Sequence, residues 1–399
     1  MSPPQASPLP MDPARLVRAV FVSRPNRFIV AAQGPDGAVV EAHMPNPGRL
    51  RELLLPGARL LLAPPPPETP GRRPTVVAVM RGKRPVLLHT QWNNRVARWL
   101  LDRRLVPGWG DQEVVRAEVP VGGSRFDFLL RGPQGEMLVE VKSCTLFGGN
   151  CAMFPDAVTE RGRRHLEELA ELARTGRRCA VLFLVHDAEV SWFSPDYHTD
   201  PAFSETLCAV REQVRVIPLA LSWNARMELD TSRIRELPVP WGHVAREQGD
   251  RGAYWLILRL DRPKAVDTGA LGTLAFPAGH WVYVGSAMRG LRARMARHLR
   301  RGKARHWHAD YLREAADGAE VLALRSADRR ECEIARALDG VLTPGPKGFG
   351  CGDCACETHL FFSREHPLDR PEVHRILERF RMTVPDGADT DSTPAGSVS

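Results

Sequence analysis

The sequence predicts an α/β and α+β fold with a small β-barrel, an α/β domain containing a mixed sheet, and a second α/β unit. Residues 15–89 alternate short apolar runs with turns, which is typical of a small barrel. Strand-like and helix-like segments then alternate up to about residue 221, as in an α/β sandwich. Further strands and helices begin at Gly252, after a polar stretch that contains prolines.

The composition describes a globular protein that favours polyanionic partners. Of the 399 residues, 43% are hydrophobic and 26% charged, and the formal net charge is +8. No apolar run is long enough for a membrane-spanning helix, and the N-terminus lacks the features of a signal peptide. The eight cysteines do not have the pattern of a secreted disulfide framework. We therefore expect a cytoplasmic protein without a membrane partner, and the sequence leaves its oligomeric state open.

The expected elements follow the chain in order. The strands of the barrel are RFIVAA, AVVEAHM, ARLLLAP, TVVAVM and PVLLH. The α/β domain is expected to contain a helix over 91–104, a hairpin over 124–143, a helix over 158–175, a strand over 179–185, a helix over 201–212 and a strand over 214–221. The second unit is expected to have the strands AYWLILRL, HWVYVGS and EVLALRS and helices over 290–301, 306–316 and 329–338.

These patterns predict the domain boundaries. The expected parts are a disordered tail over 1–14, the barrel over 15–85, the α/β domain over 86–236, a linker over 237–250, the second unit over 251–367, and a C-terminal helix with a disordered tail over 368–399.

Asp127, Glu140 and Lys142 indicate chemistry most strongly. If the turn Gly132–Gly135 closes a symmetrical hairpin, Asp127 faces Glu140, and the two carboxylates repel each other unless a cation lies between them. Lys142 projects from the same face as Glu140. Such a group can hold Mg²⁺ or Mn²⁺, align a water molecule and offset charge on a phosphate. The alternative is a solvated hairpin face with an ordinary Glu–Lys pair.

Several separate motifs within residues 15–235 resemble the sugar fermentation stimulation protein family. They are FVSRPNRF, AHMPNPGRLRELLLPG, SRFDFLL, VEVKSCTLF, FPDAVTERGRRHLEEL and DPAF. The resemblance implies an OB-like barrel followed by a PD-(D/E)XK nuclease-like domain, and it implies DNA binding. It also implies that Asp127, Glu140 and Lys142 match the nuclease triad and that Glu118 is a further metal ligand.

The same motifs supply candidate contacts to nucleic acid. Arg125 begins the hairpin motif, and Arg161 and His165 project from one side of a helix, from which they would approach a phosphate. On the barrel, a groove for nucleic acid would be lined by Arg24, Asn26, Arg27, His43, Asn46 and Arg49. The alternatives are an exposed helix face for the first group and turn chemistry set by neighbouring prolines for the second.

Two triplets in the second unit, Gly252-Ala253-Tyr254 and Tyr283-Val284-Gly285, resemble the paired elements of GIY-YIG endonucleases. The closer resemblance is to an uncharacterised GIY-YIG-related domain, and it rests on GSAMRGLRARMARHLR, HWHADYL and GFGCGDCACETHLF. It implies catalytic roles for Tyr254, Tyr283 and Arg294 and a metal-binding role for Glu331. Because the triplets lie far apart and Ala253 replaces isoleucine, binding without cleavage is the alternative.

Residues 286–305 carry eight Arg and Lys residues and no acid. At helical spacing these charges nearly encircle the helix, which suits a phosphate backbone, and we expect contacts from Arg292, Arg297 and His298. A solvated basic face is the alternative.

A cluster near the C-terminus has side chains that suit Zn²⁺: Cys351, Cys354, Cys356 and His359. Four ligands within nine residues would need an unusually tight loop, so buried thiols or a loop packed against the active site remain open alternatives. In a further alternative, His306 and His308 replace some of these four residues as zinc ligands.

Taken together, the sequence predicts a DNA-binding protein that hydrolyses phosphodiesters with Mg²⁺ or Mn²⁺, and we expect DNA rather than RNA as its partner. The alternative is a non-catalytic DNA-binding regulator of sugar metabolism genes, in which the carboxylates are structural.

Overall fold

The computed structural model describes residues 7–66, 68–69 and 71–388. The chain forms two compact units. The first comprises Met1–Asp196, Ala202–Trp241 and Val384–Ser399, and the second comprises Tyr197–Pro201 and Gly242–Thr383. Of the tails expected to be disordered, residues 1–6 and 389–399 fall outside the described residues, whereas within 7–14 Leu9 is buried in the core. Among the described helices, none has both the length and the apolar composition needed to cross a membrane.

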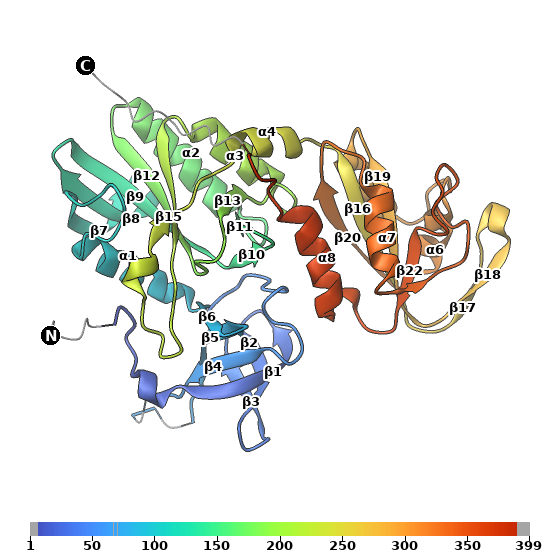
Figure 1. Ribbon diagram of the computed structural model, residues 1–399, viewed down its shortest axis with the longest axis horizontal. Coiled ribbons are helices and arrows are strands. Elements are labelled where there is room, and N and C mark those ends of the chain that lie inside the picture. The colour runs from blue at the N-terminus through green and yellow to red at the C-terminus, as the bar shows by residue number, and fades with distance from the viewer. Residues whose placement is uncertain (1–6, 67, 70, 389–399) are drawn as a thin grey trace. The chain divides into compact units, whose positions relative to one another are not determined.

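The first unit begins with the barrel, which follows a short 3₁₀ turn at Pro13–Arg15. Its strands are β1 (Val17–Asn26), β2 (Ile29–Gln33), β3 (Val39–His43), β4 (Arg59–Ala63), β5 (Thr75–Arg81) and β6 (Arg84–Leu87). They pair in the order β3-β2-β1-β4-β5-β6, and a contact between β3 and β5 at His43 and Thr75 closes the first five into a barrel. The predicted small barrel is confirmed (Figure 1).

The remainder of the first unit is built on a mixed sheet. Its strands are β7 (Glu113–Val121), β8 (Ser124–Gly132), β9 (Gly135–Cys144), β12 (Arg178–Val185), β14 (Val214–Ala220) and β15 (Arg235–Glu236), in the order β15-β14-β12-β9-β8-β7. The strands β9, β12 and β14 are parallel, whereas β7, β8 and β9 form an antiparallel meander. The predicted mixed sheet is therefore confirmed. A smaller sheet pairs β10 (Leu146–Gly148), β11 (Cys151–Phe154) and β13 (Trp192–Pro195).

Three helices cover the two faces of the mixed sheet: α1 (Asn93–Asp102), α2 (Glu160–Arg174) and α3 (Pro201–Val210). Buried residues of α1 pack with Phe128, Val139 and Val141 on one face, and those of α2 and α3 pack on the other. Thr159 caps the start of α2 by accepting a hydrogen bond from the backbone of Gly162, which places the helix close to its predicted position.

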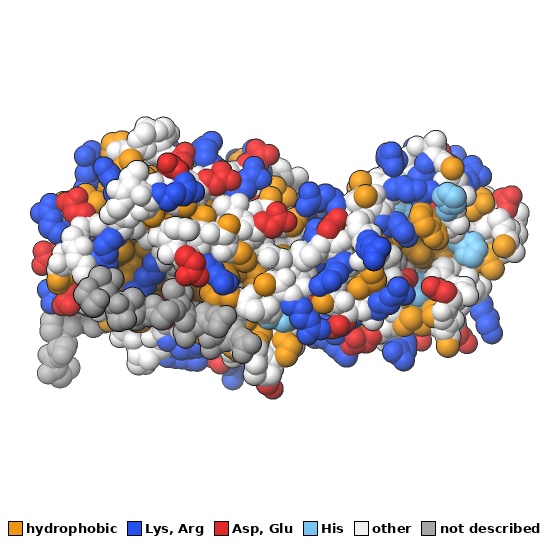
Figure 2. Space-filling view, turned by 90° about the horizontal axis from the view of Figure 1, so that it is seen from above, with side chains coloured by type: hydrophobic (Ala, Val, Ile, Leu, Met, Phe, Trp, Pro, Cys, Tyr) orange, Lys and Arg blue, Asp and Glu red, His pale blue; other side chains and the backbone are white. Residues whose placement is uncertain are grey.

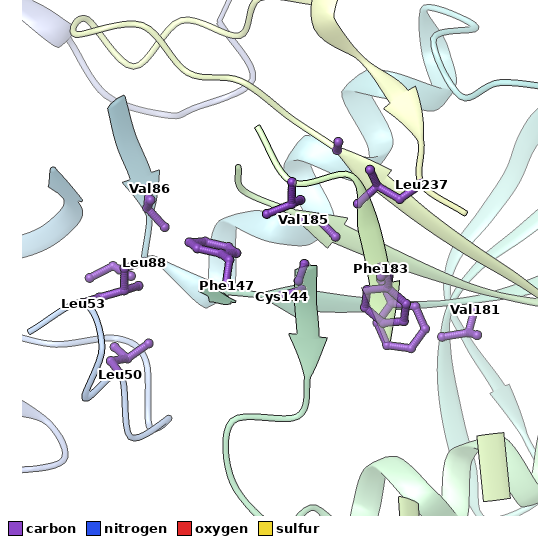
Figure 3. Close-up of a cluster of buried hydrophobic side chains, with 14 of the residues drawn as sticks. Leu50, Leu53, Val86, Leu88, Cys144, Phe147, Val181, Phe183, Val185 and Leu237 are labelled. Carbon is purple, nitrogen blue, oxygen red and sulfur yellow. The ribbon is translucent and has the colours of Figure 1, made fainter. Parts of the chain in front are cut away.

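The barrel and the mixed sheet share one apolar core. Figure 3 shows Phe147 between Val86 of the barrel strand β6 and Val185 of the central strand β12. Leu88 and Phe183 belong to the same cluster and are both buried. The two parts of the first unit are thus held together by continuous packing, which fixes the barrel relative to the hairpin.

The second unit is a five-stranded antiparallel sheet with helices on both faces. Its strands are β16 (Gly252–Leu260), β19 (Gly279–Ala287), β20 (Gly318–Arg325), β21 (Thr343–Pro344) and β22 (Leu360–Ser363), in the order β20-β16-β19-β22-β21, and β17 (Lys264–Asp267) pairs with β18 (Thr273–Phe276). One face packs against α5 (Leu291–Leu299) and α6 (His308–Ala315), and the other against α7 (Glu331–Asp339) and α8 (Pro371–Arg381). The segment 237–250, expected to be a linker, contains the helix α4 (Trp241–Glu247).

Candidate active site and the Cys/His cluster

The hairpin has the predicted register. Arg131 pairs with Glu136 and Phe128 with Val139, and the ladder of hydrogen-bonded pairs between β8 and β9 stops there. Beyond it, Asp127 Oδ2 accepts a hydrogen bond from the backbone N–H of Val141 at 2.6 Å. A side-chain carboxylate thus occupies the place of the next ladder bond, so the strands separate where the two acids lie.

Glu140 is buried, and one of its oxygens has two hydrogen-bond donors as neighbours. Its Oε1 accepts hydrogen bonds from Lys142 Nζ at 2.5 Å and from His165 Nδ1 at 2.6 Å. Burial alone would raise the pKa of Glu140, but the hydrogen bond from His165 and the charge of Lys142 together hold that pKa below its usual value. Glu140 is therefore ionised at neutral pH.

The other oxygen of Glu140, Oε2, is buried without a hydrogen-bond partner. A buried, unsatisfied carboxylate oxygen is costly unless something positive reaches it. Lys142 and His165 both contact Oε1, so Oε2 is the atom left for a further ligand. The donor set of two carboxylates therefore fits a hard divalent cation.

Asp127 is the acid of the site whose pKa is raised toward neutral pH. Its Oδ1 accepts a hydrogen bond from Asn94 of α1 at 2.6 Å. Burial, and next the charge of Glu140, raise the pKa of Asp127 to about 6. Two neighbouring acids of which one resists ionisation are the arrangement expected where a cation is to be bound.

Both acids line a cavity of about 550 Å³. Its other lining residues are Glu118, Pro120, Gly122, Gly123, Ser124, Arg125, Arg161, Arg164 and His165. Arg161 and Arg164 are exposed, whereas His165 is 2% exposed. The His165 ring lines the cavity and is buried against Glu140, so its contact with a phosphate stays a prediction. The structure brings Asp127, Glu140 and Lys142 together and adds Asn94, which sequence reasoning missed because α1 lies far away along the chain.

Glu118 lines the same cavity, and its position on β7 lies across from Asp127 on β8. Its side chain is 58% exposed, and its Oε2 is 3.4 Å from Arg125 Nη1. Its backbone has a φ of 54°, a left-handed conformation that is rare for residues other than glycine. The backbone thus turns at the rim of the cavity, where Glu118 and Arg125 neutralise each other.

The barrel candidates divide into structural and exposed residues. Arg24 donates hydrogen bonds to the carbonyl oxygens of Arg27, Asn46, Gly48 and Arg49, and Asn46 is buried and caps the N–H of Gly48. The polar groups of Arg24 and Asn46 therefore organise the loop, and their contact with nucleic acid stays a prediction.

The exposed barrel candidates are Asn26, Arg27, His43 and Arg49, although Asn26 Oδ1 also accepts a hydrogen bond from the N–H of Phe28. The guanidinium of Arg27 lies 4.7 Å from the ring centre of Phe28, which is 44% exposed. An exposed aromatic ring with adjacent cations suits stacking on a base beside a phosphate. Figure 2 shows Lys and Arg side chains across the visible face of each unit.

In the second unit, the two tyrosine triplets lie on the neighbouring strands β16 and β19, where Tyr254 pairs with Gly285. A Cβ atom at Gly285 would lie 2.3 Å from Tyr254 Oη, so only glycine fits there. Tyr254 and Tyr283 are buried, with ring centres 6.3 Å apart, and burial raises the pKa of both. Arg294 lies over the ring of Trp307, 4.2 Å from its centre.

His298 and Arg297, two further predicted contacts to nucleic acid, both make contacts inside the protein. His298 is fully buried, and its Nε2 lies 2.8 Å from Tyr254 Oη. Arg297 donates to buried Asp310 at 3.1 Å, and Lys303 lies 3.2 Å from the same carboxylate. The basic segment is therefore partly neutralised by an acid from the next helix. Its exposed cations are Arg289, Arg292, Arg300, Arg301 and Arg305.

The Cys/His cluster differs from the predicted one. The ligand atoms of Cys332, Cys354, Cys356 and His359 all lie within 4.8 Å of one another. The thiol of Cys351 is buried and instead donates to the carbonyl of Glu357. Cys351 is thus outside the cluster, and Cys332 at the start of α7 takes its place. The pair Glu331-Cys332 at the start of α7 was the available sequence signal, but it lies far along the chain from the other cysteines.

Comparisons with known proteins agree with this architecture. Residues 22–88 match the family model described as the SfsA N-terminal OB domain, and residues 91–227 match the sugar fermentation stimulation protein RE domain. The sugar fermentation stimulation protein homolog of Methanothermobacter thermautotrophicus is 39% identical over 229 residues, which are 56% of this chain and 94% of that protein. The chain belongs to the sugar fermentation stimulation protein family. The family's OB domain bears out the predicted OB-like barrel.

Further relatives of this family show the same extent of similarity. The homolog of Chloroflexus aurantiacus is 44% identical over 200 residues, or 50% of this chain and 76% of that protein. A solved structure, Pyrococcus furiosus SfsA in complex with Ca²⁺, has 29% identity and a TM-score of 0.52 and covers 57% of this chain and 97% of its own. Residues 253–382 match a separate model, the domain of unknown function DUF123.

Proposed function

We propose that this protein is a metal-dependent nuclease with a PD-(D/E)XK-like centre that acts on nucleic acid, DNA rather than RNA. The observation that carries the proposal is the unsatisfied oxygen of Glu140 beside Asp127, in a cavity flanked by exposed arginines. The relative from Pyrococcus furiosus was solved with Ca²⁺, which binds to the same hard oxygen ligands as Mg²⁺ and Mn²⁺.

In this proposal each side chain has a definite task. Asp127 and Glu140 would hold the cation, which supplies charge neutralisation and a more acidic water when bound. Lys142 keeps Glu140 ionised and places a positive charge beside the reacting phosphate. Arg161 and Arg164 bind the flanking phosphates from the rim of the cavity. The exposed barrel face at Arg27 and Phe28 binds the nucleic-acid strand at a second place, distant from the cleavage site.

In this proposal the second unit binds nucleic acid but does not cleave it. Its GIY-YIG-like tyrosines are buried, and Tyr254 is hydrogen-bonded to His298. Its exposed arginines, among them Arg289, Arg292 and Arg300, suit the phosphate backbone.

One observation favours the second candidate, a non-catalytic DNA-binding regulator of sugar metabolism genes. Glu140 Oε1 already accepts hydrogen bonds from Lys142 and His165, so part of the acidic pair is satisfied without a metal. The test is to incubate the purified full chain with single-stranded DNA, double-stranded DNA and RNA, with and without Mn²⁺. We expect cleavage of DNA that requires Mn²⁺. If the protein binds these nucleic acids but cuts none of them, the regulator is correct.

The affinity for a divalent metal is expected to fall as the pH drops below about 6. The pKa of Asp127 is raised to about 6, and a protonated carboxyl group does not bind a cation, so binding must release a proton. Below that pKa the affinity should fall about tenfold for each pH unit, and above it the affinity should level off. Calorimetric titration with Mn²⁺ between about pH 5 and pH 8 measures this. The same slope in Asp127→Asn would show that another group titrates.

A further inference from the structure

The cluster around Cys332 has the dimensions of a metal site. Zn²⁺ in a tetrahedral site lies about 2.3 Å from each thiolate, which puts neighbouring sulfur atoms about 3.8 Å apart. The four ligand atoms of Cys332, Cys354, Cys356 and His359 already lie within 4.8 Å of one another. Three sulfurs and one imidazole are a ligand set that structural zinc sites use, and small side-chain movements would complete the tetrahedron.

The hydrogen bonds of His359 orient its ring for a metal. His359 is 1% exposed, and its Nε2 lies 3.5 Å from Cys354 Sγ, inside the cluster. On the opposite side of the ring, Nδ1 donates to Glu331 Oε1 at 3.2 Å. The other oxygen of Glu331 accepts a hydrogen bond from Ser286 Oγ. A carboxylate on the second nitrogen is the usual arrangement that fixes a metal-binding histidine.

The surroundings of the cluster provide access and a compensating charge. Cys332 and Cys356 line a hollow of about 400 Å³, which also contains Arg336. Three thiolates and one Zn²⁺ leave a net charge of about −1. Arg336 lies one turn after Cys332 on α7, so its guanidinium can offset that charge.

The cluster would also tie down a long irregular loop. Between β21 and β22, residues 345–359 have no helix or strand. A Cβ atom at Gly350 would lie 2.5 Å from Tyr283, so this loop packs directly against the tyrosine pair. Gly350 N also donates to His308 Nδ1 at 3.2 Å. Loops of this length need such anchors to stay in one conformation.

We propose that Cys332, Cys354, Cys356 and His359 bind a structural Zn²⁺ ion and that Glu331 is a positioning residue for His359. The ion joins the start of α7 to the loop that covers Tyr283. The two oxygens of Glu331 contact His359 and Ser286, which fits this positioning role. This inference concerns a different unit from the proposed nuclease centre and stands independently of it.

The test is to measure the zinc content of the full chain after purification under reducing conditions and dialysis. We expect about one thiolate-bound zinc in the wild type, because the four ligands close one tetrahedral site. Cys332→Ser should lose it. Cys351→Ser is the matched control, because it removes a buried thiol of the same loop that lies outside the cluster, and it should keep the metal. Glu331→Gln should weaken zinc binding by about 10- to 100-fold, as expected for the partner of a metal-binding histidine.

Two further measurements keep the test decisive. Replacing zinc by Co²⁺ gives the wild type a sulfur-to-cobalt absorption band, which ions held by carboxylates cannot produce, so it does not depend on the variants folding. Mass spectrometry and thiol titration reveal any disulfide. The proposal is overturned if the wild type shows no such band, if Cys332→Ser keeps the wild-type affinity, or if the cysteines are oxidised to a disulfide in place of binding metal.

Discussion

Asp127→Asn is expected to lower the rate of Mn²⁺-dependent cleavage by at least about 10³-fold. The substitution removes one of the two anionic ligands, and a bound metal contributes several kcal/mol to the stabilisation of a phosphoryl transition state, where each 1.4 kcal/mol is a factor of ten. Affinity for DNA should change little, because the exposed arginines at the rim remain. Initial rates on labelled DNA, together with a binding titration in Ca²⁺, measure the two effects separately.

The matched control is Asp102→Asn, the same chemical change at an exposed carboxylate that is paired with Arg98. It should leave the rate unchanged. If the two variants cleave equally well, Asp127 is not a metal ligand. If both cleave like the wild type, the activity belongs to a contaminant or to another site.

Folding of Asp127→Asn can be checked through the sign of its stability change. Burial raises the pKa of Asp127 from 3.8 to about 6, so the folded state disfavours the ionised form. The stability contributed by this group is present below about pH 4 and is lost as the pH rises through about 6. At neutral pH and without metal, the neutral asparagine should therefore stabilise the hairpin by up to about 3 kcal/mol. Hydrogen exchange of peptides from β8 and β9 would show this as slower exchange.

Asp310→Ala is expected to destabilise the second unit by about 3–5 kcal/mol, since it leaves buried cations without their partner. Asp310 is 1% exposed, and its carboxylate contacts Arg297, Lys303 and the backbone N–H of His306. Several of these contacts are lost together, which makes the cost larger than that of a surface ion pair. Denaturant dependence of hydrogen exchange in α5 and α6 measures the free energy of opening locally.

Asp328→Asn provides the control for Asp310→Ala. Asp328 forms an ion pair of 2.7 Å with Arg246, and both side chains are more than half exposed, at 64% and 56%. Such pairs contribute less than about 1 kcal/mol. If the amides of α5 and α6 exchange no faster in Asp310→Ala than in Asp328→Asn, then Asp310 does not stabilise the basic segment.

The hairpin register could be predicted because it depends on a local pattern. The apolar alternation in β8 and β9 and the turn at Gly132–Gly135 fix which residues face each other. The placement of Asp127 near Glu140 followed from that register. The contacts of Glu140 with His165 and of Asp127 with Asn94 could not be predicted, because the partners come from helices whose packing depends on the whole sheet.

Several predicted nucleic-acid contacts differ from the arrangement in the structure for one physical reason. Arg24, Arg297 and His298 have the chemistry of nucleic-acid contacts, but each is satisfied inside the protein by groups remote in sequence. A sequence shows which side chains can bind a phosphate, whereas only burial and hydrogen bonding show which of them are already occupied. The exchange of Cys351 for Cys332 in the metal cluster has the same origin, since α7 brings its cysteine to the loop from a distant segment.

The apolar core around Phe147 is continuous from the barrel into the mixed sheet. Under the proposed function, this packing would hold the strand-binding residues Arg27 and Phe28 at a set distance from the cavity where the strand would be cut. The distance between the binding site on the barrel and the cleavage site would then determine the number of nucleotides between them. Fragments released from a bound end would accordingly have a uniform length.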